Sequence, residues 1–346
     1  MVKYTTLGTT DLKISKICLG TMTWGVQNSQ EEGFEQMDYA LNQGVNFWDT
    51  AELYAVPPSA DTYGKTEEII GNWFKKTGKR NEVILATKVA GPGPFWIRQG
   101  KGIDKQNIIE AVNESLKRLQ TDYIDLYQLH WPNRDNYHFQ QNWNFNPQFS
   151  PEQVEENFVE VLQTLDQLIK DGKIRHIGLS NETEWGVMKY LQLSKKHNLP
   201  RIQSNQNEYS LLCRHFEPGF AEIAIAEKCG LLAWSPLATG LLTGKYMDGA
   251  RPEGSRWKLD SWSTNRDTKQ ANQAVKQYHE IANKHGLNPS QMALAFVNSR
   301  PFVTSNIIGA TSMEQLKTNI DSVNIELSDD VKKKITSIYQ TYPIPY

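Results

Sequence analysis

The stretch Val45-Asn-Phe-Trp-Asp-Thr-Ala-Glu-Leu-Tyr54 begins as a short apolar run and ends in polar residues. Gly44, directly before it, is typical of the end of a helix. Val45–Trp48 is too short for a helix and rich in residues that suit a buried strand. Asp49 therefore stands where a strand ends, and Tyr54 follows it five residues later. A free tyrosine, with a pKa of about 10, is a poor proton donor at neutral pH unless a positive charge lies nearby.

Two later predicted strands supply such a charge and a second polar group. Val83–Lys88 is a β-rich run that ends in a lysine, and Tyr123–His130 is another that ends in a histidine. The whole chain alternates in this way between short apolar runs and amphipathic stretches of helical periodicity. The predicted strands are Ile17–Gly20, Val45–Trp48, Val83–Lys88, Tyr123–His130, Ile174–Ser180, Ile202–Gln206, Gly230–Ser235 and Val303–Ile308.

Such alternation predicts an α/β protein with a parallel sheet covered by helices. Either a closed (β/α)8 TIM barrel or a doubly wound open sheet has this pattern. Gly20-Thr-Met-Thr-Trp-Gly25 lacks the middle glycine of a dinucleotide-binding fingerprint, which argues against the open sheet. Useful polar residues end nearly every strand, as the C-terminal face of a barrel requires. We therefore expect one barrel domain over residues 1–346, with long loops after the fourth and seventh strands, at Trp131–Ser150 and Pro236–Asn265.

Other segments fit this barrel. Tyr4–Leu7 and Leu12–Ile14 flank a turn-rich patch and predict an N-terminal β-hairpin that plugs the bottom of the barrel. The predicted helices are Glu31–Gln43, Thr66–Phe74, Asn107–Leu119, Pro151–Lys170, Glu184–Lys196, Phe216–Lys228, Thr268–His285, Pro289–Asn298, Ser312–Val323 and Asp329–Tyr339.

Composition narrows the possible partners. The net charge of −2 over 346 residues indicates no basic face for nucleic acid or a membrane surface. Cys18, Cys213 and Cys229 are an odd, widely spaced set, which favours a reducing cytoplasm over a disulfide framework. There is no signal-peptide pattern at the start and no run of about 18 apolar residues. The histidines and cysteines show no metal-ligand spacing, so we expect no metal.

Asp49, Tyr54, Lys88 and His130, each at the tail of a successive strand, resemble the catalytic tetrad of the aldo-keto reductases. Three stretches strengthen the resemblance, which runs over nearly the whole chain: Trp48–Tyr54, Gly178–Asn181 and Trp234–Lys245. The sequence is most similar to the bacterial Tas-like branch, which is related to the voltage-gated potassium channel β-subunits. Taken singly, each residue has an ordinary structural interpretation, such as packing for the tyrosine or a solvated surface position for the lysine. Their joint occurrence at consecutive strand ends favours catalysis.

The resemblance implies a role for each member of the tetrad. Tyr54 would be the general acid that protonates a carbonyl oxygen as hydride reaches the carbon. Lys88 would lower the pKa of Tyr54, and Asp49 would keep Lys88 charged and in place. His130 would donate a hydrogen bond to the substrate oxygen.

Hydride chemistry needs a cofactor, because no side chain donates hydride. By resemblance, Ser180, Asn181 and Gln206 hold the nicotinamide carboxamide, for which amide side chains offer donors and acceptors. Trp234 ends the seventh strand and presents a flat ring that could stack on the nicotinamide, whereas the alternative of a buried core aromatic is less favoured because Ser235-Pro236 follows it. The resemblance also implies a pyrophosphate belt formed by Ser235, Pro236, Leu237, Ala238, Thr239, Gly240, Leu241, Leu242, Thr243, Gly244 and Lys245. Gly309, Thr311, Gln315 and Asn319 follow the last strand and would contact the adenosine half of the cofactor.

The sequence departs from the family in this last motif. Many members hold the 2′-phosphate of NADP there with a lysine and an arginine, and here those places carry small residues and Gln315. The channel β-subunit branch instead uses a lysine and an arginine from the seventh loop, which Lys245 and Arg256 match. We therefore expect NADP(H) rather than NAD(H), although both residues could be solvated loop charges.

The sequence indicates the residues that contact the substrate less clearly. Trp24, Phe95, Trp131 and Trp143 lie in loops at the predicted mouth and suit an apolar or aromatic carbonyl, or else pack the loops together. Three functions are open. The first is an NADPH-dependent reductase of aldehydes or ketones, and the second is a cofactor-holding subunit that senses redox state with little turnover. The third, a Schiff-base aldolase with Lys88 as nucleophile, is disfavoured because Asp49 would keep that lysine charged. The sequence fixes neither the substrate nor the oligomeric state.

Overall fold

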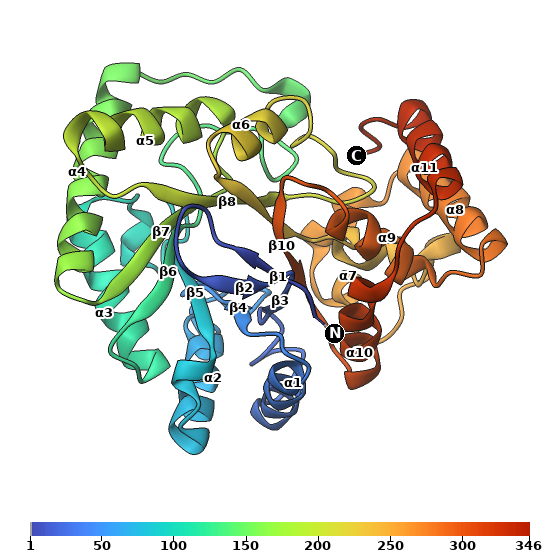
Figure 1. Cartoon of the computed structure of the whole chain (residues 1–346), viewed down its shortest axis with the longest axis horizontal. Helices are drawn as coiled ribbons and strands as arrows, with labels where there is room; N and C mark the ends of the chain where they lie inside the picture. Colours follow the sequence, from blue (N-terminus) through green and yellow to red (C-terminus); the bar gives the residue numbers. More distant parts are fainter. Residues whose placement is uncertain (1) are drawn as a thin grey trace.

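The computed structural model describes residues 2–346 as a closed parallel barrel with a short hairpin at one end (Figure 1). The hairpin pairs β1 (Tyr4–Thr6) with β2 (Lys13–Ser15) in antiparallel fashion. The barrel order is β10-β3-β4-β5-β6-β7-β8-β9, so each strand lies beside its neighbours in sequence and β10 closes onto β3. The predicted (β/α)8 barrel with an N-terminal hairpin is therefore confirmed. Its strands are β3 (Ile17–Gly20), β4 (Phe47–Asp49), β5 (Ile84–Val89), β6 (Ile124–Leu129), β7 (Ile174–Ser180), β8 (Ile202–Glu208), β9 (Gly230–Trp234) and β10 (Val303–Ile308).

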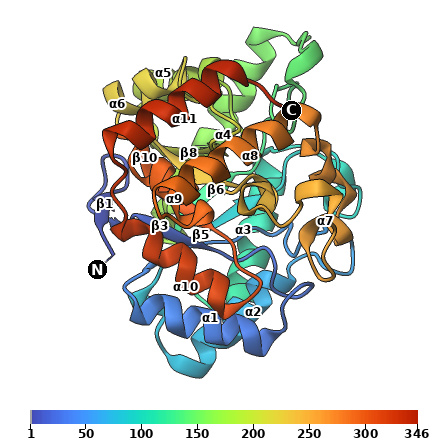
Figure 2. The same cartoon turned by 90° about the vertical axis from the view of Figure 1, so that its right-hand side faces the viewer.

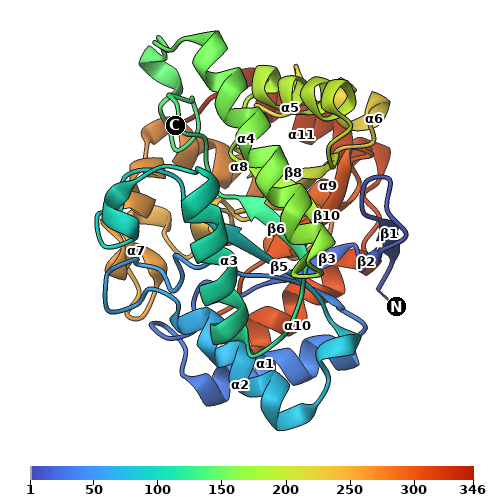
Figure 3. The ribbon, with the colours of Figure 1, turned by 90° about the vertical axis from the view of Figure 1, so that its left-hand side faces the viewer.

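Helices surround the barrel on its outside (Figures 1 and 3). Several begin at a side-chain cap: the Asp104 carboxylate accepts from the backbone N–H of Asn107, and the hydroxyl of Ser150 accepts from that of Gln153. The helices are α1 (Gln30–Asn42), α2 (Lys65–Thr77), α3 (Lys105–Leu119), α4 (Pro151–Lys170), α5 (Glu184–His197), α6 (Phe220–Ala226), α7 (Arg256–Leu259), α8 (Lys269–Lys284), α9 (Pro289–Asn298), α10 (Met313–Asp321) and α11 (Asp329–Thr341). Within residues 2–346, no helix combines the length and the apolar character that a bilayer crossing needs.

Two apolar cores separate the inside of the barrel from its outside. The larger core fills the layer between the strands and the helices. The smaller one lies inside the barrel and includes Leu7 and Ile14 of the hairpin with Phe47, Leu126 and Leu232 of the strands. The hairpin thus closes the N-terminal end of the barrel.

The opposite end carries the long loops. Figures 2 and 3 show β1 at one end of the molecule and α7 at the other. The loop after β9 is more structured than expected, because it holds α7 and the short 3-10 helices Ala238–Thr243, Met247–Gly249 and Ser261–Arg266. The C-terminal ends of the strands meet at this face, where a barrel places its functional side chains.

Candidate active site

The turn that follows β4 places Tyr54 beside the end of β5. The backbone N–H of Thr50 donates to Ala86 O at 2.9 Å, and that of Glu52 donates to Lys88 O at 3.3 Å. The turn therefore continues along β5 after β4 has ended. As a result, Asp49, Tyr54 and Lys88 lie at one corner of the barrel mouth, as the sequence predicts.

Lys88 is the centre of this corner and is completely buried. Its Nζ donates to Asp49 Oδ2 at 2.6 Å and to Thr50 O at 2.7 Å, and it lies 3.4 Å from the Tyr54 hydroxyl. Burial alone lowers the pKa of Lys88, but the charge of Asp49 and the Tyr54 hydroxyl raise it above its ordinary value. The ammonium group is therefore charged at neutral pH, which argues against Lys88 as a Schiff-base nucleophile.

Two opposing effects act on the pKa of Tyr54. Burial raises the pKa of its phenol, while Lys88 lowers it, and burial dominates, so the net shift is upward. The sequence predicts the direction of the Lys88 contribution but not this net result, because the extent of burial depends on loops that the sequence does not place. A raised pKa means that Tyr54 carries its proton at neutral pH.

His130 directly follows β6 and completes the group. Its ring lies edge-on to Tyr54 with centroids 5.9 Å apart, and its backbone N–H donates to Val89 O at 3.0 Å. Burial, and then the charge of Lys88, hold the pKa of His130 well below its usual range. Within residues 2–346, its buried Nδ1 has no hydrogen-bond partner. The ring is therefore a neutral imidazole that lies beside the ring of Tyr54.

Two amide side chains bind the other oxygen of Asp49. Gln128 Nε2 donates to Asp49 Oδ1 at 3.1 Å, and Gln206 Nε2 donates to the same oxygen at 2.8 Å. Gln206 thus lies at the tetrad, where it orients Asp49. Sequence reasoning missed Gln128, although the two-residue alternation of a strand could have found it, since Gln128 and His130 share a face of β6.

Ser180, Asn181 and Trp234 form a second group on the next strand ends. Asn181 Nδ2 donates to His130 O at 2.9 Å, and the indole Nε1 of Trp234 donates to Asn181 Oδ1 at 3.1 Å. The Ser180 hydroxyl donates to Gln206 O at 2.9 Å. These predicted cofactor residues therefore adjoin the tetrad.

Aromatic side chains cover this group from the loops. Phe139 of the β6–α4 loop stacks on Trp234 at 6.0 Å between centroids and lies edge-on to Trp131 and Trp262. Neither Phe139 nor Trp262 was identified from the sequence, because a loop has no periodicity that shows which of its aromatics turn inward.

The predicted aromatic rim is only partly correct. Trp131 does lie at the mouth, with its ring centroid 4.8 Å from that of His130. Trp24 is completely buried instead, and its indole donates to Gln36. Phe95 and Trp143 point outward and are 75% and 62% exposed.

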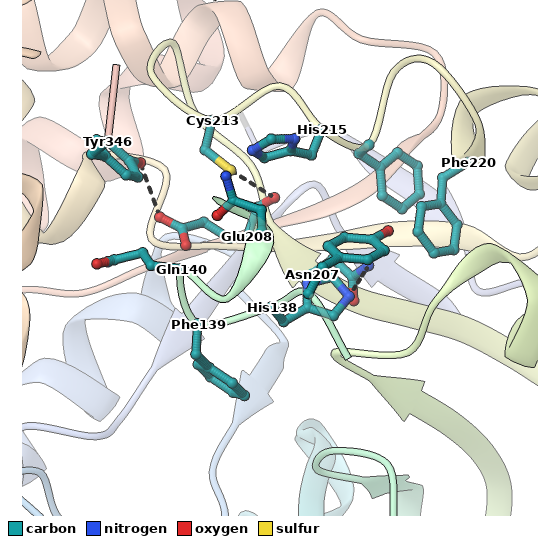
Figure 4. A pocket seen from close by; sticks show the side chains of 12 residues that line it. His138, Phe139, Gln140, Asn207, Glu208, Cys213, His215, Phe220 and Tyr346 are labelled. Atoms are coloured by element: carbon teal, nitrogen blue, oxygen red, sulfur yellow. Dashed lines mark hydrogen bonds between the residues drawn. The ribbon is translucent and has the colours of Figure 1, made fainter. Parts of the chain in front are cut away.

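A small cavity lies behind Phe139 (Figure 4). It measures about 30 Å³, which is room for about two water molecules and too little for a substrate. On its far side the Tyr346 hydroxyl donates to Glu208 Oε1 at 3.1 Å, and Arg266 binds the same carboxylate through Nη2 at 2.9 Å. Arg266 thereby fastens the loop after β9 to the end of β8, and Tyr346 fastens the C-terminal residue to the same place.

The segment Ser235–Lys245 has an unusual backbone. Ser235, Ala238, Thr239, Gly240 and Gly244 have positive φ, and the N–H groups of Ala238, Gly240, Leu242 and Gly244 donate to carbonyls of the segment itself. Non-glycine residues adopt this conformation rarely, so three of them in one short segment indicate a specialised shape. The other members are Pro236, Leu237, Leu241, Leu242 and Thr243.

Lys245 is the last residue of this segment, and Arg256 begins α7. Their chain neighbours Tyr246 and Trp257 stack on each other, with ring centroids 4.2 Å apart. Lys245 Nζ lies over the ring of Tyr246, and within residues 2–346 no carboxylate lies within ion-pair distance of it. Arg256 donates through Nε to Ser263 and through Nη1 to Met22, which leaves Nη2 for a ligand. Burial lowers the pKa of Arg256, although Asp260 lies 3.5 Å away.

The residues after β10 hydrogen-bond to one another. Gln315 Oε1 accepts from the backbone N–H of Thr311 at 3.0 Å, and Asn319 Nδ2 donates to Gly309 O at 3.0 Å. Among residues 2–346, no atom lies within 4 Å of the place where a Cβ on Gly309 would stand. The space in front of Gly309 is open, so packing does not explain a glycine here.

The family model described as the aldo/keto reductase family matches residues 16–340. The chain belongs to the aldo/keto reductase family. It is therefore an oxidoreductase of the carbonyl-reducing kind. It is 48% identical to "Protein tas" of Escherichia coli over 99% of each chain. It is 33% identical to the "Uncharacterized oxidoreductase YrpG" of Bacillus subtilis over 98% of this chain and 96% of that one. It is also 32% identical to a putative voltage-gated potassium channel subunit beta of Schizosaccharomyces pombe, over 99% of this chain and 95% of that one.

Proposed function

We propose that this aldo/keto reductase reduces aldehydes or ketones with NADPH and that Tyr54 is the general acid. The observation that carries the proposal is the contact of a buried, charged Lys88 with both Asp49 and the Tyr54 hydroxyl, at 2.6 and 3.4 Å. The raised pKa of Tyr54 keeps its proton available at neutral pH. As negative charge develops on the substrate oxygen, Lys88 stabilises the phenolate that Tyr54 leaves behind.

His130 orients the substrate in this proposal. Because the imidazole is neutral, it donates a hydrogen bond to the carbonyl oxygen without competing as an acid. The protein residues would thereby fix the oxygen between two donors, and a bound nicotinamide would supply the hydride to the carbonyl carbon. The aromatic side chains Trp131, Phe139 and Trp262 favour an apolar or aromatic group next to that carbonyl.

The residues present fit a dinucleotide, which would supply the hydride when bound. Asn181 and Gln206 offer amide groups beside Trp234, and the backbone N–H groups at Ser235–Lys245 that bond to no carbonyl of the segment would suit a pyrophosphate. Lys245 and Arg256 have donors for a 2′-phosphate, and the open space at Gly309, next to Thr311, Gln315 and Asn319 in the same motif, would suit the adenosine half. We therefore propose NADP(H) over NAD(H). The free, buried cysteines Cys18, Cys213 and Cys229 suit a reducing compartment such as the cytoplasm.

Substitution of Tyr54 by Phe tests the proposal. We expect Y54F to bind NADPH with unchanged affinity and to lose about 10²–10⁴-fold in kcat, since it lacks the acid. The measurement is NADPH absorbance over a panel of aromatic and aliphatic aldehydes, with cofactor affinity from fluorescence quenching. Carbonyl reduction retained in Y54F would refute the role of Tyr54.

A second function is favoured by the relatives named as potassium channel β-subunits. A subunit that holds NADP(H) and reports redox state to a partner would need the same site. The same panel separates the two functions, because a sensing subunit would bind NADPH tightly and oxidise it very slowly with every aldehyde.

A further inference from the structure

The turn between Asp49 and Tyr54 carries a buried carboxylate with an unusually full set of donors. Glu52 is completely buried. Its Oε1 accepts from the backbone N–H of Ala90 at 2.7 Å, and its Oε2 accepts from the Tyr63 hydroxyl at 2.9 Å. Arg98 adds a two-pronged contact, with Nη2 to Oε1 at 2.5 Å and Nη1 to Oε2 at 2.9 Å. The carboxylate therefore ties the Tyr54 turn to the end of the strand that carries Lys88.

Arg98 comes from the β5–α3 loop, residues 90–104, whose tip is exposed. Phe95 and Trp96 of this loop are 75% and 44% exposed, whereas the side chain of Arg98 is only 6% exposed. Arg98 and Gln99 both have positive φ, at 45° and 59°. Non-glycine residues hold such conformations where their surroundings impose them, and Arg98 is fixed by its contact with Glu52.

The same loop also supports the residues after His130. The indole Nε1 of Trp131 donates to Pro92 O at 3.0 Å, and a Cβ on Gly91 would lie 2.3 Å from the Trp131 ring. Asn133 exchanges two hydrogen bonds with the backbone of Ile103, at 2.6 and 2.7 Å. One loop thus contacts the chain on both sides of the proposed substrate oxygen.

We propose that Glu52 and Arg98 are positioning residues that hold the Tyr54 hydroxyl within reach of Lys88 and of the substrate oxygen. The proposal rests on the proposed function of Tyr54. The hydroxyl lies 3.4 Å from Lys88 Nζ, so a displacement of about 1 Å would end the contact and leave the phenol misaligned. The conformation of the β5–α3 loop then sets the turnover rate without contact with the substrate.

The experiment compares R98M, E52Q and the double variant E52Q/R98M with the wild type. We expect kcat to fall about 10–100-fold in each, with NADPH affinity and aldehyde KM within threefold of the wild-type values. Since the two residues act as a unit, the double variant is no slower than the slower single variant. Slower proton delivery also makes the chemical step limiting, so the isotope effect with NADPH deuterated at the transferred C4 position rises. R98K keeps the charge but loses the two-pronged fork, and we expect it to recover part of kcat.

R80M is the matched control. Arg80 makes a similarly buried contact with Asp125 at 2.8 Å, but at the other end of β5. We expect R80M to lower the melting temperature and to leave kcat and the isotope effect unchanged. The double variant removes both charges and guards against a single variant that fails to fold, because an unpaired buried charge is the main cause of such failure.

A kcat within twofold of wild type in folded R98M or E52Q/R98M would overturn the inference, as would an equal loss in R80M. If the wild type itself reduces no aldehyde, the proposed function fails. The positioning role of Glu52 and Arg98 is then tested by titration of the Tyr54 phenol instead of by kcat. Difference absorbance against Y54F gives the pKa of that phenol. A shift of this pKa in R98M but not in R80M would support the positioning role, and no shift in either would refute it.

Discussion

Lys88 is a charged residue at a position that water does not reach. Its three donors are directed to the Asp49 carboxylate, the Thr50 carbonyl and the Tyr54 hydroxyl. Burying an ammonium group is costly unless it is paired and hydrogen-bonded, and here each condition is met. The same pairing keeps a positive charge beside a phenol whose conjugate base would otherwise be strongly disfavoured by burial. Stability and proton transfer therefore depend on one ion pair.

Substitution of Asp49 by Asn separates these two effects. D49N leaves Lys88 buried without its counter-ion, so we expect a loss of about 3 kcal/mol in the free energy of unfolding. We also expect kcat to fall at least about tenfold, because loss of Asp49 disfavours the charged form of Lys88, which then favours the ionised form of Tyr54 less. Urea denaturation and steady-state kinetics measure the two losses.

The double variant D49N/K88M is the control for this prediction. It removes the uncompensated charge, so the free energy of unfolding should recover while kcat stays low. If D49N is as stable as the wild type, or if the double variant regains turnover, the buried ion pair does not have the role argued here.

At the scale of elements, the segment from β9 to α8 carries the proposed preference for NADP(H). Lys245 is the sharper test because its Nζ has no acidic partner within the described residues, whereas Arg256 is held by Ser263 and Asp260. A charge-assisted hydrogen bond contributes about 1.5–3 kcal/mol. We therefore expect K245M to raise the Kd for NADPH about 10–150-fold and the Kd for NADH less than threefold. Titration of both cofactors by fluorescence checks this, and equal effects on the two would exclude a contact with the 2′-phosphate.

The bounds of individual helices and strands show which predictions from sequence patterns are correct. Strand β7 (Ile174–Ser180) and helix α4 (Pro151–Lys170) have the predicted bounds, since a clear apolar run and a Ser-Pro entrance mark them. Helix α6 was predicted over Phe216–Lys228 but spans only Phe220–Ala226. Pro218 and Gly219 end the preceding turn, and Phe216 instead packs on Phe220 and Phe302.

The candidate site was predictable to a similar extent. Residues at strand ends, such as Asp49 and Lys88, could be located because the barrel brings all strand ends to one face. Phe139 and Arg98 could not, because their partners are set by the path of long loops. The net shift in the pKa of Tyr54 could not be predicted either, because it depends on burial by those loops.

The two ends of the barrel differ in the residues that they carry, one end being apolar and sealed and the other polar. The hairpin seals the N-terminal end with Leu7 and Ile14, both completely buried. The other end keeps polar groups that hydrogen-bond to one another under a cover of aromatic side chains. His130, His138 and His215 lie toward this end, and His176 lies near the start of β7; in all four positions the charged form of the imidazole is disfavoured.

Four histidines have a pKa below the ordinary value, mainly because of burial: His130, His138, His176 and His215. For His138 burial lowers the pKa to about 4. The unfolded chain binds a proton at each of these residues at about pH 6.5, whereas the folded chain does so only at lower pH. As the pH falls below about 6.5, protonation therefore stabilises the unfolded state before it stabilises the folded state. The contribution of these histidines to the free energy of unfolding is complete above about pH 6.5 and is lost as the pH falls toward 4.

We expect the free energy of unfolding to decrease steeply between about pH 6.5 and pH 4, with His138 alone contributing about 3 kcal/mol of the change. H138Q keeps a donor for the Glu182 carbonyl, which lies 3.1 Å from His138 Nε2, but it cannot be protonated. Its stability should therefore depend less on pH than that of the wild type, even if it is lower at pH 7. The control is H197Q at the exposed end of α5, which should follow the wild-type curve. Urea denaturation at a series of pH values measures all three proteins, and parallel curves for H138Q and the wild type would show that His138 is protonated as easily in the folded barrel as in the unfolded chain.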